Sequence, residues 1–117
     1  MVPSTLLALV PQFGNLKTTL SQEDLFTEVW RQLEKDGHVA GITIPTISPI
    51  DLETMHLTLT NCLQELSPSA LPEFLYRIDV PEHEDNFNPS TDAFFEHLAW
   101  RILQREALKV YFRLFYA

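Results

Sequence analysis

The chain has 117 residues, of which 45% are hydrophobic and 21% are charged, and this composition excludes a disordered tail. Its length predicts a single domain over residues 1–117. Sixteen acidic residues against eight basic ones give a formal net charge of −8, which disfavours non-specific binding to nucleic acid or to an anionic membrane.

Cysteine usage and hydropathy favour an intracellular location. Cys62 is the only cysteine, so the chain forms no internal disulfide and no multi-cysteine zinc site, which fits a reducing compartment. No apolar stretch approaches the length of about 20 residues that spans a bilayer as a helix. Residues 1–20 hold a short apolar run between Pro3 and Pro11 without a basic start, so we predict an irregular segment that is not a signal peptide. We therefore expect a cytoplasmic protein without a membrane partner.

A first amphipathic helix is predicted over residues 22–36. Ser21 and Asp24 have the spacing of a capping box, and Gly37 supplies a stop. The apolar residues that recur at helical intervals and would face the core are Leu25, Phe26, Val29, Trp30 and Leu33.

A second helix is predicted to begin after Ser48, which would be its N-cap, with Pro49 in the first helical position. It is predicted to end before Pro68. Its apolar stripe consists of Leu52, Met55, Leu59, Cys62, Leu63 and Leu66. A shorter third helix is predicted over residues 70–78, because a proline is tolerated in a first turn.

Two segments also allow a small β structure. Residues 39–47 are rich in β-branched side chains but contain Gly41 and Pro45, which favours a buried connection over a short strand. In the alternative α+β fold, residues 74–80 would pair with them as a second strand instead of completing the third helix. The polar, acidic residues 81–92 predict an exposed loop.

The longest predicted helix lies at the C-terminal end, because no proline or glycine interrupts residues 91–117. The apolar face that would pack on the core consists of Phe95, Ala99, Ile102, Leu103, Ala107, Val110 and Leu114. The aromatic and β-branched content of residues 110–117 is also compatible with a strand. Together these segments predict a mostly α fold, a bundle of three to four helices with a long C-terminal helix.

Half of the basic residues recur at every fourth position of this last helix: Arg101, Arg105, Lys109 and Arg113. With Glu106 they give residues 101–117 a local charge of +3, which leaves −11 for residues 1–100. A step of four residues advances a helix by about 40°, so the cations form a slowly turning stripe. In one interpretation, the basic stems cover apolar surface while their charged ends pair with acidic residues of the preceding elements: Glu23, Glu28, Glu34, Glu65 or their neighbours.

The other interpretation makes the same helix a docking surface, since exposed aromatic side chains beside arginine mark interfaces. We hypothesise a non-catalytic protein-interaction module, such as an adaptor, an assembly chaperone or a subunit of a larger complex. Its partner would be a second copy of the chain or a different protein. The predicted interaction residues are Leu98, Trp100, Arg101, Arg105, Leu108, Lys109, Tyr111, Phe112 and Arg113.

Metal binding or a small hydrolytic activity is the alternative hypothesis, and a nucleic-acid-associated factor is a lesser one. Glu53 and His56 share one helix face, but carboxylate-bridged metal sites need two such pairs. The acidic loop 79–88 lacks the spacing and the glycine of a calcium loop. His56 and Cys62 lie about 240° apart around one helix and cannot form a dyad. We therefore assign no catalytic residue, metal ligand, cofactor or small-molecule substrate.

Overall fold

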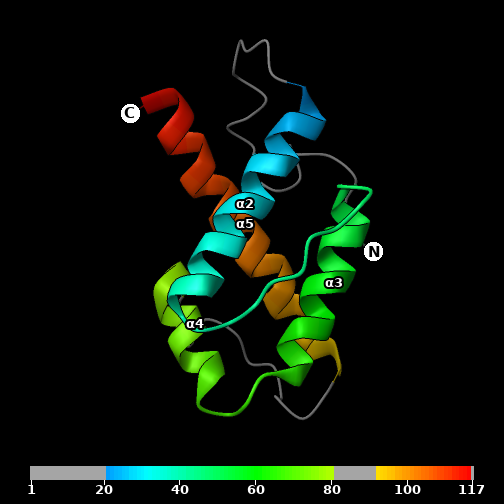
Figure 1. Cartoon of the computed structure of the whole chain (residues 1–117), viewed down its shortest axis with the longest axis vertical. Helices are drawn as coiled ribbons and strands as arrows, with labels where there is room; N and C mark the ends of the chain where they lie inside the picture. Colours follow the sequence, from blue (N-terminus) through cyan, green and yellow to red (C-terminus); the bar gives the residue numbers. More distant parts are fainter. Residues whose placement is uncertain (1–20, 81–91, 117) are drawn as a thin grey trace.

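A computed structural model describes residues 21–80 and 92–116, which form four helices and no strand (Figure 1). The helices are α2 (Gln22–Val39), α3 (Leu52–Glu65), α4 (Ala70–Ile78) and α5 (Asp92–Tyr116). The predicted mostly α fold with a long C-terminal helix is therefore confirmed. The alternative with strands near 39–47 and 74–80 is wrong, since residues 74–78 belong to α4. Within the described ranges, no helix is long and apolar enough to cross a membrane.

Helix α2 begins at the predicted capping box but runs beyond the predicted end. Ser21 Oγ accepts a hydrogen bond of 3.0 Å from the backbone N–H of Asp24. Gly37 is not the stop: the C-cap is Ala40, and Gly41 follows with a left-handed φ of +79°. Gly37 instead lies where the returning chain crosses the helix, and a Cβ atom there would meet Ile44 Cγ1 at 2.8 Å. Close packing, and not helix termination, requires that glycine.

Helix α3 begins later than predicted because a different residue caps it. Asp51 is the N-cap, and its Oδ1 accepts a hydrogen bond of 2.8 Å from the backbone N–H of Thr54. Ser48 and Pro49 lie before the helix, so the prediction of Ser48 as cap is wrong. An aspartate caps as well as a serine does, and Leu52, directly after Asp51, is buried in the core.

Helix α4 has the predicted bounds and ends where Asp79 takes a left-handed conformation with φ of 69°. The backbone N–H of Asp79 donates to the carbonyl oxygens of Leu75 and Tyr76, which satisfies the last turn. Phe74 and Ile78 are fully buried and join the helix to the common core.

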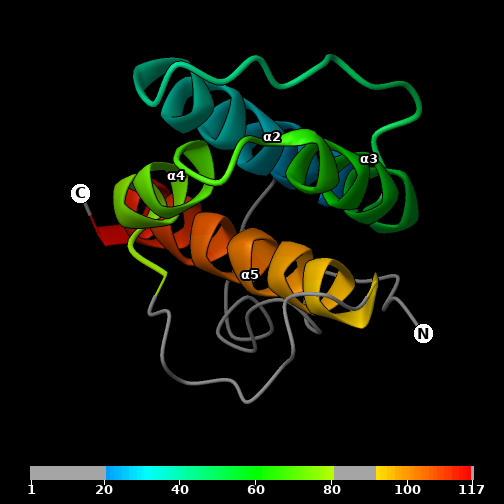
Figure 2. The same ribbon diagram turned by 90° about the horizontal axis from the view of Figure 1, so that it is seen from below.

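Helix α5 is the element on which the others pack. Figure 2 shows α2, α3 and α4 on the same side of α5, and each of them contacts it. The residues of α5 that are fully buried in the shared core are Ala99, Ile102, Leu103, Ala107 and Val110. The connection after α2 is held by Trp30, whose Nε1 donates a hydrogen bond of 2.9 Å to the carbonyl oxygen of Pro45.

The last turns of α5 extend past the other helices (Figure 1). Residues 110–116 are helical, which decides between the helix and strand interpretations of that end. Leu114, predicted for the core face, is 39% exposed. The predicted irregular segment 1–20 and acidic loop 81–92 lie outside the described residues, apart from the backbone of Asp92, and the single domain over the whole chain stays a prediction.

Candidate functional site

Arg105, Lys109 and Arg113 of α5 form ion pairs with α2 and with the end of α4. Arg105 contacts the carboxylate of Asp79 just after α4 at 2.9 Å. Lys109 Nζ lies 2.9 Å from Asp36 Oδ2 on α2. Arg113 donates at 2.9 Å to Glu28 and at 2.7 Å to Gln32 Oε1, both on α2. Of the four glutamates expected as partners, only Glu28 takes this role; Asp36 and Asp79 are the other acidic partners.

A fully buried carboxyl group lies at the centre of this network. Glu106 is 0% exposed, and Lys109 Nζ lies 3.0 Å from its Oε1. Neither carboxyl oxygen of Glu106 has a well-aligned hydrogen bond. Burial, with the neighbouring Asp36 carboxylate, raises the pKa of Glu106 to about 8, although Lys109 acts in the opposite direction. Glu106 is therefore mostly neutral at pH 7.

The two partners of Glu106 keep their charges. Burial would raise the pKa of Asp36, but its contacts with Glu106, Lys109 and Gln32 lower it below its usual value. Burial would lower the pKa of Lys109, but Asp36 and Glu106 raise it. At pH 7 the cluster of Asp36, Glu106 and Lys109 therefore holds one anion, one cation and one neutral acid.

Carboxyl groups with divergent pKa values beside a lysine are also found in acid–base catalysis. In this chain, however, the ammonium group of Lys109 already fills the position between the two carboxyl groups that a bound cation would take. Two surface hollows, of about 350 and 510 Å³, lie beside Cys62 and beside Phe26, and neither is lined by any residue of the cluster. The geometry indicates that the cluster links α2 to α5.

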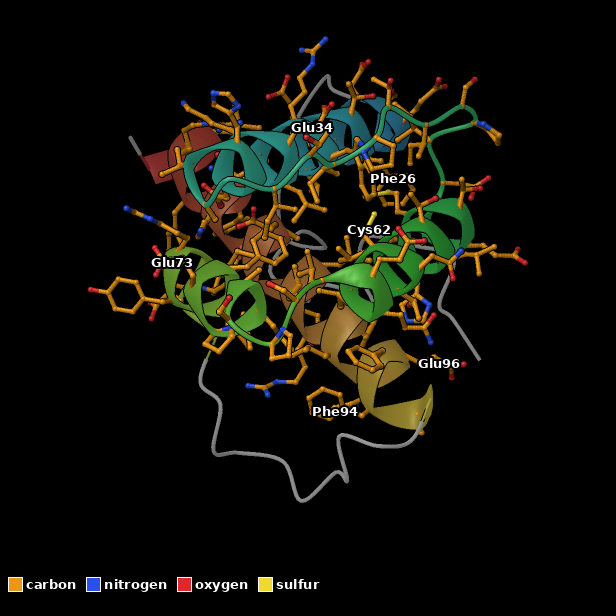
Figure 3. All side chains as sticks on the ribbon, turned by 60° about the horizontal axis from the view of Figure 1, so that its bottom comes forward. Phe26, Glu34, Cys62, Glu73, Phe94 and Glu96 are labelled. Atoms are coloured by element: carbon orange, nitrogen blue, oxygen red, sulfur yellow. The ribbon has the colours of Figure 1, made fainter. Side chains whose placement is uncertain are left out.

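The opposite side of α5 carries a different set of residues, which we call the outer face: Phe94, Arg101, Leu108 and Phe112. At 100° per residue these four lie within about 40° of one another, opposite the buried Ala99, Leu103 and Val110. Phe94 points away from the other helices in Figure 3. Phe112 is 49% exposed, and the remaining three are half-buried. Arg105 borders this face on the side of α4.

The predicted interaction residues are thus divided among four environments. Arg101, Leu108 and Phe112 lie on the outer face, whereas Arg105, Lys109 and Arg113 pair with α2 and the end of α4. Leu98 and Tyr111 are both buried at 5% exposure. Trp100 lies on the side of α3, where its ring stands edge-on to His56 at a centroid distance of 6.2 Å.

Two residues that matter to α5 were missing from the predicted set. Phe94 lies on the outer face, and helical angles alone could have placed it there. Glu106 falls between Ala99 and Val110 on the apolar face, so the same angles placed it in the core, but its acidic partner lies 70 positions away in the sequence. Only the position of α2 shows that Asp36 and Lys109 surround it.

The residues proposed for the alternative chemistry are not brought together. Glu53 is exposed, and His56 Nε2 lies 2.7 Å from the backbone carbonyl oxygen of Glu96. In the part of the chain that the structure describes, no three histidine, cysteine or acidic side chains form a group suited to a metal ion. Asp79 pairs with Arg105, and residues 81–88 of the acidic loop lie outside the described ranges.

Cys62 borders one of the hollows but does not have the character of a nucleophile. Its thiol is half-buried, and burial together with Glu65 raises its pKa, which disfavours the reactive thiolate.

Comparisons with protein-family models, with curated protein sequences and with solved structures found no match to this chain. The geometry of α5 is therefore the basis for inferring a function.

Proposed function

We propose that this chain is a non-catalytic protein-interaction module, an adaptor, assembly chaperone or subunit of a larger complex, whose partner protein docks along the outer face of α5. The observation that supports this most strongly is that α2, α3 and α4 all pack on one side of α5 (Figure 2). On the other side lie Phe94 and Leu108, which are partly buried and pack against the edge of the core, and Phe112, which is 49% exposed. Contiguous apolar side chains beside arginine are typical of protein interfaces.

The charges around the outer face indicate the chemistry of the partner. Arg101 lies within the face and Arg105 at its edge. In the Arg105–Asp79 pair the two side chains are 36% and 78% exposed, so the pair contributes no more than about 1 kcal/mol and can be exchanged. A partner carboxylate can replace Asp79 as the acceptor. The partner is therefore a segment, such as an amphipathic helix, with apolar side chains flanked by acidic ones.

The end of α5 carries exposed apolar side chains on two opposite sides. Phe112 is 49% exposed and Leu114 is 39% exposed, and they lie about 160° apart around the helix. An apolar helix end that projects beyond its own bundle gains stability when a second protein covers it.

The test asks whether proteins in an extract of the source organism bind the chain through the outer face or through another exposed apolar position. The immobilised chain is compared with the double variant Leu108→Asp/Phe112→Asp and with the control Leu57→Asp, since Leu57 on α3 is 60% exposed. We expect proteins that bind the wild-type chain and the control to be lost from the double variant. Circular dichroism verifies that all three chains remain helical.

Binding is then repeated with the purified candidate partner by isothermal titration calorimetry. We expect Kd for the double variant to be at least about tenfold weaker, because loss of a central aromatic anchor costs more than about 1.4 kcal/mol. Added salt should weaken binding to the wild-type chain, since ion pairs at Arg101 and Arg105 are screened. Equal affinity for the wild-type chain and the double variant would refute docking at the outer face.

A further inference from the structure

The contact between α2 and the C-terminal part of α5 encloses a buried carboxyl group. We propose that the cluster of Asp36, Glu106 and Lys109 is a proton-operated latch, which holds α2 against α5 while Glu106 is protonated and lets the two helices separate when that proton is lost. This inference goes beyond the proposed function, because it concerns the inner side of α5 and requires no partner.

The geometry of the cluster favours the protonated form of Glu106. The side chain is fully buried, and neither of its carboxyl oxygens has a well-aligned hydrogen bond. Lys109 Nζ lies 3.0 Å from Glu106 Oε1 and 2.9 Å from Asp36 Oδ2, so two carboxyl groups share one cation. With Glu106 neutral, the charges of the cluster balance. With Glu106 ionised, an unbalanced negative charge is buried, and this is costly.

The other charged side chains next to the cluster have partners of their own. Arg105, which precedes Glu106, pairs with Asp79 at the end of α4, and Arg113 pairs with Glu28 on α2. Among the described residues, the groups that act on the Glu106 carboxyl are therefore the other two members of the cluster. The buried residues of α3 carry no group that titrates in this range: Leu52, Met55, Leu59, Thr60 and Leu63.

The latch is closed by acid and opened by rising pH. Burial raises the pKa of Glu106 to about 8 in the closed contact, against an ordinary value of 4.5. The closed form therefore binds the proton more tightly than the open form does. Between these two values the ratio of open to closed molecules rises about tenfold per pH unit, and it levels off above pH 8. Asp36 does not reverse this response, because its own pKa is lowered and it stays ionised.

The two halves of α5 contact different helices, which makes a local opening feasible. In the first half, the ring of Trp100 stands edge-on to His56 of α3, and the carbonyl oxygen of Glu96 lies 2.7 Å from His56 Nε2. In the second half, Lys109 and Arg113 pair with α2. The C-terminal half of α5 separates from α2 while the N-terminal half remains on α3.

Thiol labelling at two matched positions of α5 tests this separation. Ala107 and Ala99 are both fully buried, but Ala107 follows Glu106, whereas Ala99 lies about two turns earlier, beside Trp100. Ala107→Cys and Ala99→Cys are each made with Cys62→Ser and labelled with iodoacetamide. Each rate is divided by the rate of the same chain unfolded in urea at the same pH, which removes the titration of the thiol itself.

We expect this ratio for Ala107→Cys to rise about 50-fold between pH 6 and pH 8. At pH 8 it should exceed the ratio for Ala99→Cys and should not depend on low concentrations of urea, because a local opening exposes little surface. A ratio that does not rise with pH would overturn the latch. Equal labelling of the two positions, with the same urea dependence, would also overturn it, since only the unfolded chain would then react.

Further variants test the role of each carboxyl group. Glu106→Gln in the Ala107→Cys chain should abolish the rise with pH, whereas the exposed Glu65→Gln should leave it unchanged. Asp36→Asn should make the rise smaller, because Lys109 is then left to balance an ionised Glu106 alone. A rise that persists in Glu106→Gln, or that is the same in Asp36→Asn, contradicts the latch.

A second measurement needs no cysteine in the core. Nuclear magnetic resonance of the side-chain carboxyl carbon of Glu106 in the unaltered chain follows its titration, and Glu106→Gln identifies the signal. We expect a midpoint near pH 8, with the amide of Val110 losing protection from hydrogen exchange over the same range. A midpoint near pH 4.5, or a Val110 amide that keeps its protection, would refute the proposal.

Discussion

At the scale of single residues, Glu106 is the group whose environment departs furthest from what its side chain prefers. It is fully buried, contacts Lys109, and has a pKa of about 8 against an ordinary value of 4.5. Between these two values the folded chain holds one proton more than the unfolded chain does. The free energy of unfolding therefore falls by about 1.4 kcal/mol per pH unit as pH rises through this window, and this contribution levels off above pH 8.

Replacing Glu106 by glutamine should make the protein more stable at neutral pH. Glu106→Gln keeps the shape of the side chain but no longer requires a proton to be taken up on folding, so the free energy of unfolding at pH 7 should rise by about 3 kcal/mol. The slope between about pH 5 and pH 8 should flatten. Urea unfolding across this range measures both effects.

The exposed Glu65→Gln serves as the control for this prediction and should leave the pH dependence unchanged. A Glu106→Gln variant that is less stable than the wild-type chain at every pH would mean that Glu106 is ionised in the fold and that its charge is needed beside Lys109. The same measurements therefore decide the protonation state of the buried carboxyl group.

At the scale of elements, N-cap residues and glycines set where each helix begins and ends. Where two such residues lie close together in the sequence, only one of them is used. Ser48 and Asp51 are both good N-cap residues, three positions apart. The structure uses Asp51, whose side chain caps the N–H of Thr54 and whose carbonyl accepts from Met55. Gly37 and Gly41 present the same choice at the end of α2, and only Gly41 has the left-handed φ that a stop requires.

Capping variants should distinguish the two candidate starts of α3. Asp51→Ala removes the hydrogen bond to Thr54 and should lower the free energy of unfolding by about 1 kcal/mol. Ser48→Ala should change it by less than about 0.5 kcal/mol, because Ser48 is exposed and lies before the helix. Thermal unfolding of the two variants in parallel gives the comparison, and the reverse order would show that the helix begins at Ser48 in solution.

At the scale of the whole molecule, the arrangement of three helices on one side of α5 decides both the core and the candidate surface. The polar residues that join α5 to the bundle lie far away in the chain: Glu28, Gln32, Asp36 and Asp79. These contacts direct Lys109 and Arg113 toward α2 and leave Arg101, Leu108 and Phe112 on the outer face. The −8 net charge opposes contact between two copies.

We therefore expect the chain to remain monomeric as its concentration rises. Sedimentation equilibrium at several concentrations should give the mass of one chain, 13.5 kDa. The prediction follows from the like charges that a two-fold contact along α5 would bring together. A mass that doubles with concentration would contradict it, and the loss of that dimer in Phe112→Asp would place the contact on the outer face.

The sequence by itself determined the helical segments and their local ends. The capping box at Ser21, the bounds of α4 and the uninterrupted length of α5 all follow from side chains within four residues of one another, so they could be predicted. The apolar residues of α5 that form the core could also be predicted, because helical periodicity is local. Three of the four residues of the outer face, Arg101, Leu108 and Phe112, were predicted from the same periodicity.

Only the tertiary structure decided what each side of α5 faces. Leu98 and Tyr111 are buried, and Lys109 holds two carboxyl groups that lie 70 positions apart. These relations depend on which helix packs against which, and helical periodicity gives the angle of a residue but not the neighbour that it meets. For that reason only the tertiary structure shows that Arg105, Lys109 and Arg113 attach α5 to α2 and to the end of α4.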